Sequence, residues 1–500
     1  MAQFLDMLGG IAAAAKPEYL LYALIGALLG TLVGVLPGLG PASAVAILFP
    51  LTAVLPPTGA IIALAGIWYG AMYGGSTTAI LLNIPGEVSS VTTAIDGYQM
   101  TRQGRAGPAL AMAAITSFLA GTVGVVLLSF AGPAIATAAL RFGPPEYLAL
   151  TVLSLTAVIS LAGPKLGRGI VMALAGLLLA GVGFDPISSA QRLVFDVPQL
   201  LGGFDAVAIM IGLFGISEVL SSVGAGLAKI YSGRLGRLWP RRDDFVRGGK
   251  AGIRGTAVGF ALGLLPGMQA SVASFLSYDV EKRVAKRPER FGKGAIEGVA
   301  GPEAANNAAA MAGFIPMLSL GIPTSATTAL LLAALVVYGF QAGPLLFTQH
   351  ADFTWTVIGS MYIGNLMLLV LNLPLVGLWA RVARIPYRVM GPVILVICVI
   401  GAYAIRGQMF DVWVALAFGV FGVALKHFGW PTIPFVLGLV LGPLLERGLR
   451  QSLSISAGDW SIFVTRPISA TVLALAAATT AVTVLWRRRL SRKGITALEE

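Results

Sequence analysis

The sequence predicts an all-α polytopic membrane protein with two homologous halves, from its composition, its apolar runs and a motif that occurs twice. Of its 500 residues, 57% are hydrophobic and only 11% are charged, whereas soluble domains carry about 25% charged residues. Long apolar runs recur from Tyr19 to Trp486, and ~20 helical residues suffice to cross a bilayer core. The runs are continuous rather than alternating, which argues against a transmembrane β-barrel.

Each apolar run is expected to form a helix because of its length and continuous hydrophobicity. In the first half the runs lie near 20–36, 42–55, 59–82, 109–139, 146–162, 168–183 and 205–222. In the second half they lie near 252–276, 304–338, 355–379, 390–405, 411–425, 431–444 and 468–486. Several runs are too long for one crossing or are cut by Gly and Pro, so the number of spans stays open.

Positive charge is concentrated beside the apolar runs. The net charge is +12, from 34 basic and 22 acidic residues. Eight basic residues lie between Lys229 and Arg254, six between Lys282 and Lys293, and five in "WRRRLSRK" near the end. Basic loops next to spans are typical of the cytoplasmic side. We therefore expect both central loops and the C-terminus to be cytoplasmic, and no nucleic-acid partner.

The polar stretch from Lys229 to Lys250 divides the chain into nearly equal parts. We expect residues 1–228 to form a first transmembrane half and 229–250 a basic cytoplasmic linker. Residues 251–500 are expected to form the second half, with a basic cytoplasmic tail. The single cysteine, Cys398, lies in an apolar run and excludes a disulfide framework.

Two motifs recur in the same order in the two halves. "GVLPGLGPAS" begins at Gly34 and "GLLPGMQAS" at Gly263, while "GGSTTAILLNIPG" (74–86) is echoed by "GIPTSATTALLL" (321–332). Duplicated halves with spans interrupted by Gly and Pro at corresponding positions are typical of secondary transporters. We expect the halves to be inverted repeats whose broken helices meet at a site near the bilayer midplane.

The broken helices also predict what the site binds. A broken helix leaves free N–H groups, which attract anions, and free carbonyl groups, which suit cations. Neither break contains Lys or Arg. The candidate substrate-binding residues of the first half are Gly38, Gly40, Ser43, Ser76, Thr77, Thr78 and Asn83. Those of the second half are Pro266, Gly267, Gln269, Ser271, Asn306, Asn307, Pro323, Thr324, Ser325 and Thr327.

A structural interpretation stands beside each of these candidates. Glycine in membrane helices most often serves close helix packing, and serine or threonine hydroxyls can bond their own helix backbone. Glu87 and Asp96 are interpreted first as loop-end charges. Proton carriage by these two residues or by Glu303, and Na⁺ binding by hydroxyl, amide and carbonyl groups, both remain open. No cofactor is expected beyond this coupling ion.

Four long segments resemble the TctA family, the large membrane subunit of tripartite tricarboxylate transporters. They are "GVLPGLGPASA", "YGGSTTAILLNIPGEVSSVTTAIDGYQMTRQGRAGPAL", "GLLPGMQASVASFLSYDVEKR" and "GPEAANNAAAMAGFIPMLSLGIPTSATTALLL". The resemblance covers most of the chain. It departs at Met268 and Gln269, where another small residue is expected after Pro-Gly.

This resemblance implies a function and partners. It implies import of di- or tricarboxylates across the bacterial inner membrane by cation symport with alternating access. It also implies a small membrane subunit and a periplasmic solute-binding protein as partners. The sequence has no G-x-x-x-x-G-K-[ST] phosphate loop, in agreement with ion coupling rather than ATP.

Two other function classes compete with the transporter. A channel of the inner membrane is the alternative, because channels also use broken helices, but the duplicated breaks favour alternating access. An enzyme is not expected, since neither H-E-x-x-H nor G-x-S-x-G occurs.

Overall fold

The computed structural model describes residues 2–36, 39–160, 166–185, 188–222, 237–268, 270–382 and 387–492. These residues are helical throughout, apart from turns and one small hairpin that pairs Gly183 with Arg192 and Phe184 with Gln191. Six of the helices are long and apolar enough to cross a membrane. The prediction of an all-helical polytopic membrane protein is therefore confirmed.

The part of the chain before the central linker contains ten α-helices among its described residues. They are α1 (Ala2–Ala14), α2 (Pro17–Gly34), α3 (Pro41–Thr52), α4 (Pro57–Leu82), α5 (Ser90–Arg102), α6 (Ala106–Ala139), α7 (Pro144–Ser160), α8 (Leu166–Ala180), α9 (Ala206–Met210) and α10 (Ser217–Ser221). Between them lie β1 (Gly183–Phe184), β2 (Gln191–Arg192), the 3₁₀ turn η1 (Pro198–Leu200) and the π-helical η2 (Ile211–Ile216).

The part after the linker contains twelve more α-helices in its described residues. They are α11 (Arg242–Gly263), α12 (Ala270–Val284), α13 (Glu297–Leu320), α14 (Ala326–Val337), α15 (Leu346–Gln349), α16 (Ala351–Asn372), α17 (Val376–Val382), α18 (Tyr387–Arg406), α19 (Met409–His427), α20 (Thr432–Ile455), α21 (Ile462–Thr465) and α22 (Pro467–Arg492). A 3₁₀ turn, η3 (Pro288–Arg290), precedes α13.

The candidate spans are fewer than the apolar runs of the sequence. They are Pro17–Gly34, Ala106–Ala139, Ala351–Asn372, Val389–Arg406, Met409–His427 and Thr432–Ile455. Two of the apolar runs are each divided into two helices. The run 252–276 is divided between α11 and α12, and the run 304–338 is divided at Gly321, whose φ of 70° is left-handed.

Both helices that precede a Pro-Gly break pack on a partner through a stripe of glycines. On α2, Gly26, Gly30 and Gly34 face α4, and a Cβ at any of them would lie 2.3–2.4 Å from a carbonyl oxygen of α4. On α11, glycines 255, 259 and 263 face α13, and a Cβ there would lie 2.1–2.4 Å from a carbonyl oxygen. Such backbone contact requires glycine, so helix packing is the correct interpretation of these six residues.

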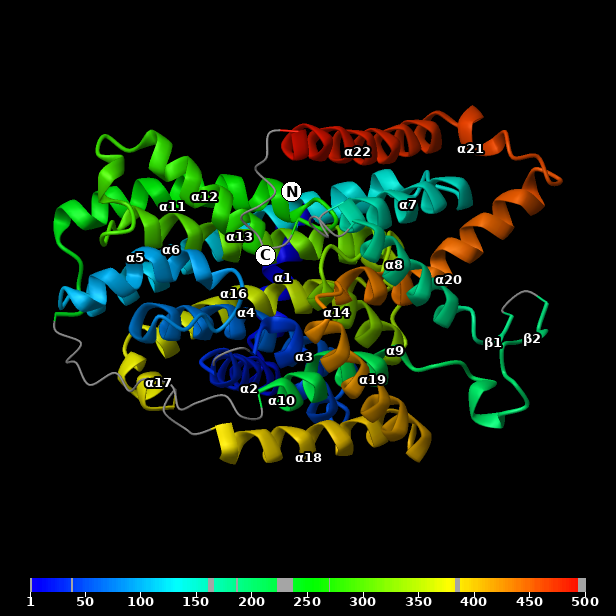
Figure 1. Cartoon of the computed structure of the whole chain (residues 1–500), viewed down its shortest axis with the longest axis horizontal. Coiled ribbons are helices and arrows are strands. Elements are labelled where there is room, and N and C mark those ends of the chain that lie inside the picture. Colours follow the sequence, from blue (N-terminus) through cyan, green and yellow to red (C-terminus); the bar gives the residue numbers. More distant parts are fainter. Residues whose placement is uncertain are drawn as a thin grey trace.

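The helices around these two pairs come from distant parts of the sequence. Helix α6 packs along α13, and α16 packs against α4 and α6. In Figure 1, α22 and α18 lie at opposite edges of the molecule, and α2, α3 and α4 lie close together below the α11–α13 group. The two motif regions are therefore held in one helical body.

Candidate functional site

The two breaks have the local structure of helix N-termini. Helix α3 begins at Pro41 after the extended Gly40, and a proline at this first position costs the helix no hydrogen bond. In the second half, α12 begins at Ala270 after the break that follows Gly263. The first-turn N–H groups of a helix have no partner within that helix. The sequence thus places donor-rich helix starts inside otherwise apolar segments.

The second motif of each half contains a left-handed helix end followed by Ile-Pro. Helix α4 ends at Asn83 with φ of 57°, and α13 ends at Gly321 with φ of 70°. After Gly321 the chain begins α14 with a capping box, in which the Ser325 hydroxyl accepts from Thr328 N and the Thr328 hydroxyl accepts from Ser325 N. These local signals end one apolar helix and begin the next within a few residues.

A direct hydrogen bond fastens the two motifs of the second half together. Gly267 N donates to Thr324 O over 2.9 Å. Gly267 has φ of 81°, a conformation that L side chains rarely adopt. The break before α12 and the start of α14 are therefore held at a fixed separation.

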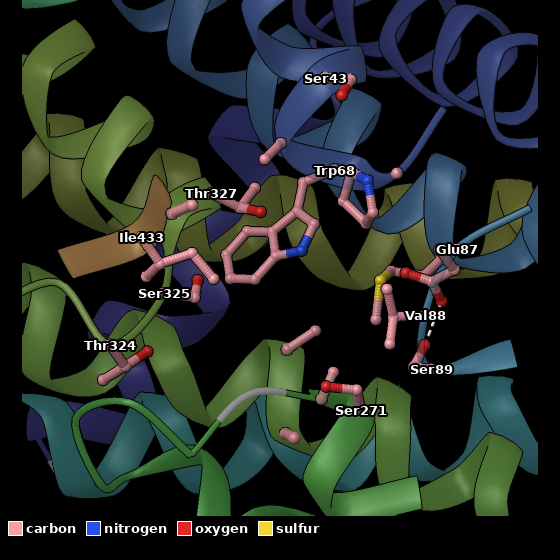
Figure 2. A pocket seen from close by; sticks show the side chains of 18 of the residues that line it. Ser43, Trp68, Glu87, Val88, Ser89, Ser271, Thr324, Ser325, Thr327 and Ile433 are labelled. Atoms are coloured by element: carbon pink, nitrogen blue, oxygen red, sulfur yellow. Dashed lines mark hydrogen bonds between the residues drawn. The ribbon is translucent and has the colours of Figure 1, made fainter. Parts of the chain in front are cut away.

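The helix starts surround one cavity of about 230 Å³. Its polar lining comes mainly from the beginnings of five helices: α3 (Gly40–Ser43), α5 (Glu87–Ser89, just before it), α12 (Ala270, Ser271), α14 (Ser325–Thr327) and α20 (Thr432, Ile433). In Figure 2, Trp68 projects between the Ser325 and Thr327 side and the Glu87 and Ser89 side. We call this space the central cavity.

The walls of the central cavity are apolar and are built largely by α4 and α13. Trp68 and Met72 of α4 and Ala309 and Ala310 of α13 line it. Trp68 stacks on Phe314 of α13, with ring centroids 4.7 Å apart. An apolar wall with a few polar groups at one level is typical of a small-molecule site.

The central cavity combines many hydrogen-bond donors with little formal charge. None of its described lining residues is Lys, Arg or His, and its one ionisable group is the carboxyl of Glu87. Ser89 donates a hydrogen bond to Glu87 Oε1, and Asn306 Nδ2 lies 3.4 Å from the same atom. Positive potential must therefore come from backbone N–H groups and helix dipoles.

A second, much smaller cavity of about 10 Å³ lies beside Glu303. The carboxylate of Glu303 accepts from Thr93 at 2.5 Å, from Ser76 at 2.7 Å and from Ser117 at 3.3 Å. These hydroxyls come from α5, α4 and α6, whereas Glu303 is on α13. We call this space the Glu303 pocket; its lining includes Tyr73, Ser76, Thr77, Ser117, Glu303 and Asn372.

The structure brings part of the sequence-predicted site together in the central cavity. The candidates that line it are Gly40, Ser43, Ser271, Thr324, Ser325 and Thr327. Ser76 and Thr77 line the Glu303 pocket instead. Asn306 approaches Glu87, and Asn307 donates to Ser117 and to the Glu303 carbonyl.

The remaining candidates among the described residues line neither cavity. Thr78 donates to Gly75 O, which is the backbone role that hydroxyls in helices often have. Asn83, Pro266, Gly267 and Pro323 shape the chain at the helix ends and do not line either space. Gly38 and Gln269 lie outside the described residues.

The candidate acids are buried in the structure, whereas ordinary charges at loop ends are exposed to solvent. Glu87, Asp96 and Glu303 are all buried. Asp96 Oδ1 accepts from Gly294 N and Ala295 N, so it binds the loop before α13. Asp96 therefore has a structural role, whereas Glu87 and Glu303 line cavities.

Several lining residues were not found from the sequence. Trp68, Met72 and Phe214 line the central cavity, and Thr93, Ser117 and Asn372 approach the Glu303 pocket or its carboxylate. A single polar residue inside an apolar run, such as Ser117 or Asn372, was the available signal. Which of these side chains face one another depends on how α6 and α16 pack on α13 and α4, and the sequence does not show this packing.

Comparisons with known proteins agree with this architecture. The model of the "Tripartite tricarboxylate transporter TctA family" matches residues 20–437. A relative from Agrobacterium vitis, "Uncharacterized 52.8 kDa protein in TAR-I ttuC' 3'region", is 46% identical over 492 residues, 98% of each chain. A second A. vitis relative, "Uncharacterized protein in TAR-II ttuC' 3'region", is 49% identical over 217 residues, 43% of this chain and 90% of its own length.

No solved structure matches the chain. The family match covers both Pro-Gly breaks and both Ile-Pro motifs, and with them every residue that lines the two cavities. The protein is therefore a multi-pass membrane subunit and not an enzyme. It belongs to the tripartite tricarboxylate transporter TctA family.

Proposed function

We propose that this chain is the permease subunit of a binding-protein-dependent carboxylate importer, and that the central cavity is its substrate site. The observation that carries the proposal is the set of five helix starts around a cavity whose described lining residues include no basic side chain. Helix N-termini bind carboxylates through free N–H groups and the helix dipole. Transporters use the same device for anionic substrates within the membrane.

The size and lining of the cavity favour a small organic acid. Its volume of about 230 Å³ is below the ~300–1,000 Å³ of pockets for drug-sized ligands. Hydroxyls of Ser43, Ser271 and Thr327 can donate to carboxylate oxygens. The absence of a fixed cation among the described lining residues limits the binding strength, which lets the substrate leave after each cycle.

Glu87 makes the site dependent on a second ion. An ionised Glu87 would repel a carboxylate in the same cavity, because its carboxyl group is buried and lines that space. A bound cation or a proton would remove this repulsion. Anion binding is therefore expected to be favourable only together with a cation, which is the requirement for symport.

The membrane potential also requires cation coupling. Each elementary charge moved through 100 mV is worth ~2.3 kcal/mol. Entry of a dianion against an interior-negative potential therefore costs roughly 4–5 kcal/mol for that difference. Two co-transported monovalent cations cancel this cost, and a third makes the potential drive uptake.

The paired architecture supports the proposal of two related halves, residues 1–228 and 251–500, joined by 229–250. Each proposed half contains a glycine-striped helix, a Pro-Gly break, a short helix and a long helix with a left-handed end. We propose that the halves are inverted repeats and that the broken helices move against the remaining bundle. That movement would expose the central cavity to each side in turn.

The proposed setting is the bacterial inner membrane, with the basic loops and the C-terminus in the cytoplasm. The proposed partners are a small membrane subunit and a periplasmic solute-binding protein, as in other tripartite systems. The binding protein would select the carboxylate, and the central cavity would pass it on.

Uptake by the three reconstituted components tests the proposal. Ser43→Leu and Thr327→Leu place bulk in the central cavity and should abolish uptake of labelled di- and tricarboxylates without loss of folded protein. Thr137→Leu, on an exposed face of α6, is the matched control and should transport normally. Normal transport by both cavity variants would refute the site. Passive flux that persists without any ion gradient would favour a channel.

A further inference from the structure

Glu303 is a deeply buried acid that lies outside the substrate site. It is 1% exposed, and no basic side chain among the described residues pairs with it. An ionised carboxylate in an apolar interior is very costly unless a positive charge neutralises it. The Glu303 pocket therefore requires either a proton or a cation.

The carboxyl group of Glu303 accepts hydrogen bonds from three hydroxyl groups. Ser76 and Ser117 donate to Oε2, and Thr93 donates to Oε1. Each of these hydroxyls keeps lone pairs that can face a cation. Four helices thus supply oxygen atoms to one small space.

A second observation at this position is a buried side-chain oxygen that can serve as a ligand. Asn372 lines the Glu303 pocket, is 6% exposed, and has a side-chain oxygen with no hydrogen-bond partner in the described structure. Its Nδ2 donates to Leu368 O at 3.0 Å, so a flipped amide would place two oxygens against each other. The unsatisfied atom is therefore an oxygen, which can accept a hydrogen bond or coordinate a cation.

We infer that the Glu303 pocket binds one Na⁺ ion, with the carboxylate of Glu303, the hydroxyls of Ser76 and Ser117 and the amide oxygen of Asn372 as its ligands. The inference rests on the proposed function, for which it names the coupling ion and its site. One carboxylate matches one monovalent charge, and a volume of about 10 Å³ accommodates one water-sized particle.

The position of the pocket explains how the ion could affect the substrate. Helices α4 and α13 line both cavities. On α4, Met72 in the central cavity and Ser76 in the Glu303 pocket are one turn apart, and on α13 Glu303 and Ala310 are about 10 Å apart. A cation that draws α4 and α13 together at the Glu303 pocket therefore also sets the width of the central cavity, which the same two helices line.

Direct Na⁺ binding to the purified full-length chain, without substrate, tests the inference. Radiolabelled Na⁺ should bind saturably to the wild type, and unlabelled Na⁺ but not K⁺ should displace it. Glu303→Gln should abolish this binding. Ser76→Ala, which keeps the charge, should weaken it about tenfold, the factor that ~1.4 kcal/mol represents. Glu289→Gln, the same change at an exposed position, should bind like the wild type.

The outcomes separate this inference from the proposed function. Na⁺ binding that survives in folded Glu303→Gln, or no saturable Na⁺ binding to the wild type, would overturn the Na⁺ site. If Glu303→Gln does not fold, an unchanged Na⁺ affinity in Ser76→Ala has the same meaning. Carboxylate uptake that is driven only by a proton gradient would support the proposed function but refute Na⁺ as the coupling ion. Na⁺ binding without any gradient-driven uptake would support the Na⁺ site but refute the proposed function.

Discussion

Gly259 of α11 makes a close backbone contact with α13, and its substitution by alanine tests the packing account. A Cβ at this position would lie 2.1 Å from Ala305 O on α13. Carbon and carbonyl oxygen atoms in contact are normally about 3.3–3.6 Å apart. The methyl group therefore forces α11 and α13 apart by roughly 1 Å or more, a separation that follows from the same contact distance.

The expected change in the free energy of unfolding is the sum of two opposing contributions. Inserting a methyl group into a tightly packed contact costs typically about 1–3 kcal/mol, and the backbone of α13 cannot move like a flexible side chain. Replacing glycine by alanine in a helix returns at most about 1 kcal/mol. We expect a net loss of stability, and we expect uptake to fall because α11 leads into the break that positions α12.

The assay compares Gly259→Ala with Gly249→Ala on the same helix, where a Cβ meets nothing within 4 Å. Both variants gain the same helix propensity, so only the contact with α13 differs. Gly259→Ala should unfold at a lower temperature in detergent and should transport less in proteoliposomes than Gly249→Ala. Equal unfolding temperatures and equal uptake for the two variants would refute the close-packing argument.

Three further predictions concern the site and its supports. Gly40→Ala should raise the substrate KM without changing the unfolding temperature, because its Cβ has 4.0 Å of clearance but narrows the central cavity; an unchanged KM would contradict this. Thr328→Val removes the capping box of α14 and should cost about 0.5–2 kcal/mol, seen as a lower unfolding temperature that Thr328→Ser largely restores. Asp96→Ala leaves two buried N–H groups unpaired and should cost at least about 1–3 kcal/mol; full stability would exclude the structural role of Asp96.

The broken helices were predictable because the signals are local. Pro41 begins α3, and the left-handed ends at Asn83 and Gly321 each precede Ile-Pro. Glycine and proline act on the backbone of their own neighbourhood, so their positions in the sequence indicate where helices stop.

The assembly of the site could not be predicted in the same way. Ser76 and Thr77 were grouped with the substrate residues, yet they face the Glu303 pocket rather than the central cavity. One helical residue turns a side chain by about 100°, so a polar cluster in sequence is divided between two faces. Partners such as Ser117 and Asn372 enter only because α6 and α16 pack on α13 and α4.

The buried acids show most clearly what the sequence alone does not predict. Near the ends of helices, a carboxyl group is usually solvated, which made loop-end charges the first interpretation of Glu87 and Asp96. Burial reverses that interpretation, since a buried charge requires a partner. Asp96 finds its partners in backbone N–H groups, whereas Glu87 faces the central cavity.

The central claim is that the chain couples carboxylate movement to a cation gradient through the central cavity. The most direct test measures labelled di- and tricarboxylate uptake in proteoliposomes that contain this subunit, the small membrane subunit and the binding protein, with imposed Na⁺ or proton gradients. Our account predicts accumulation above the outside concentration under an inward Na⁺ gradient, and collapse of that accumulation when the gradient is dissipated. Equilibration of the carboxylate at the same rate with and without a gradient would contradict it.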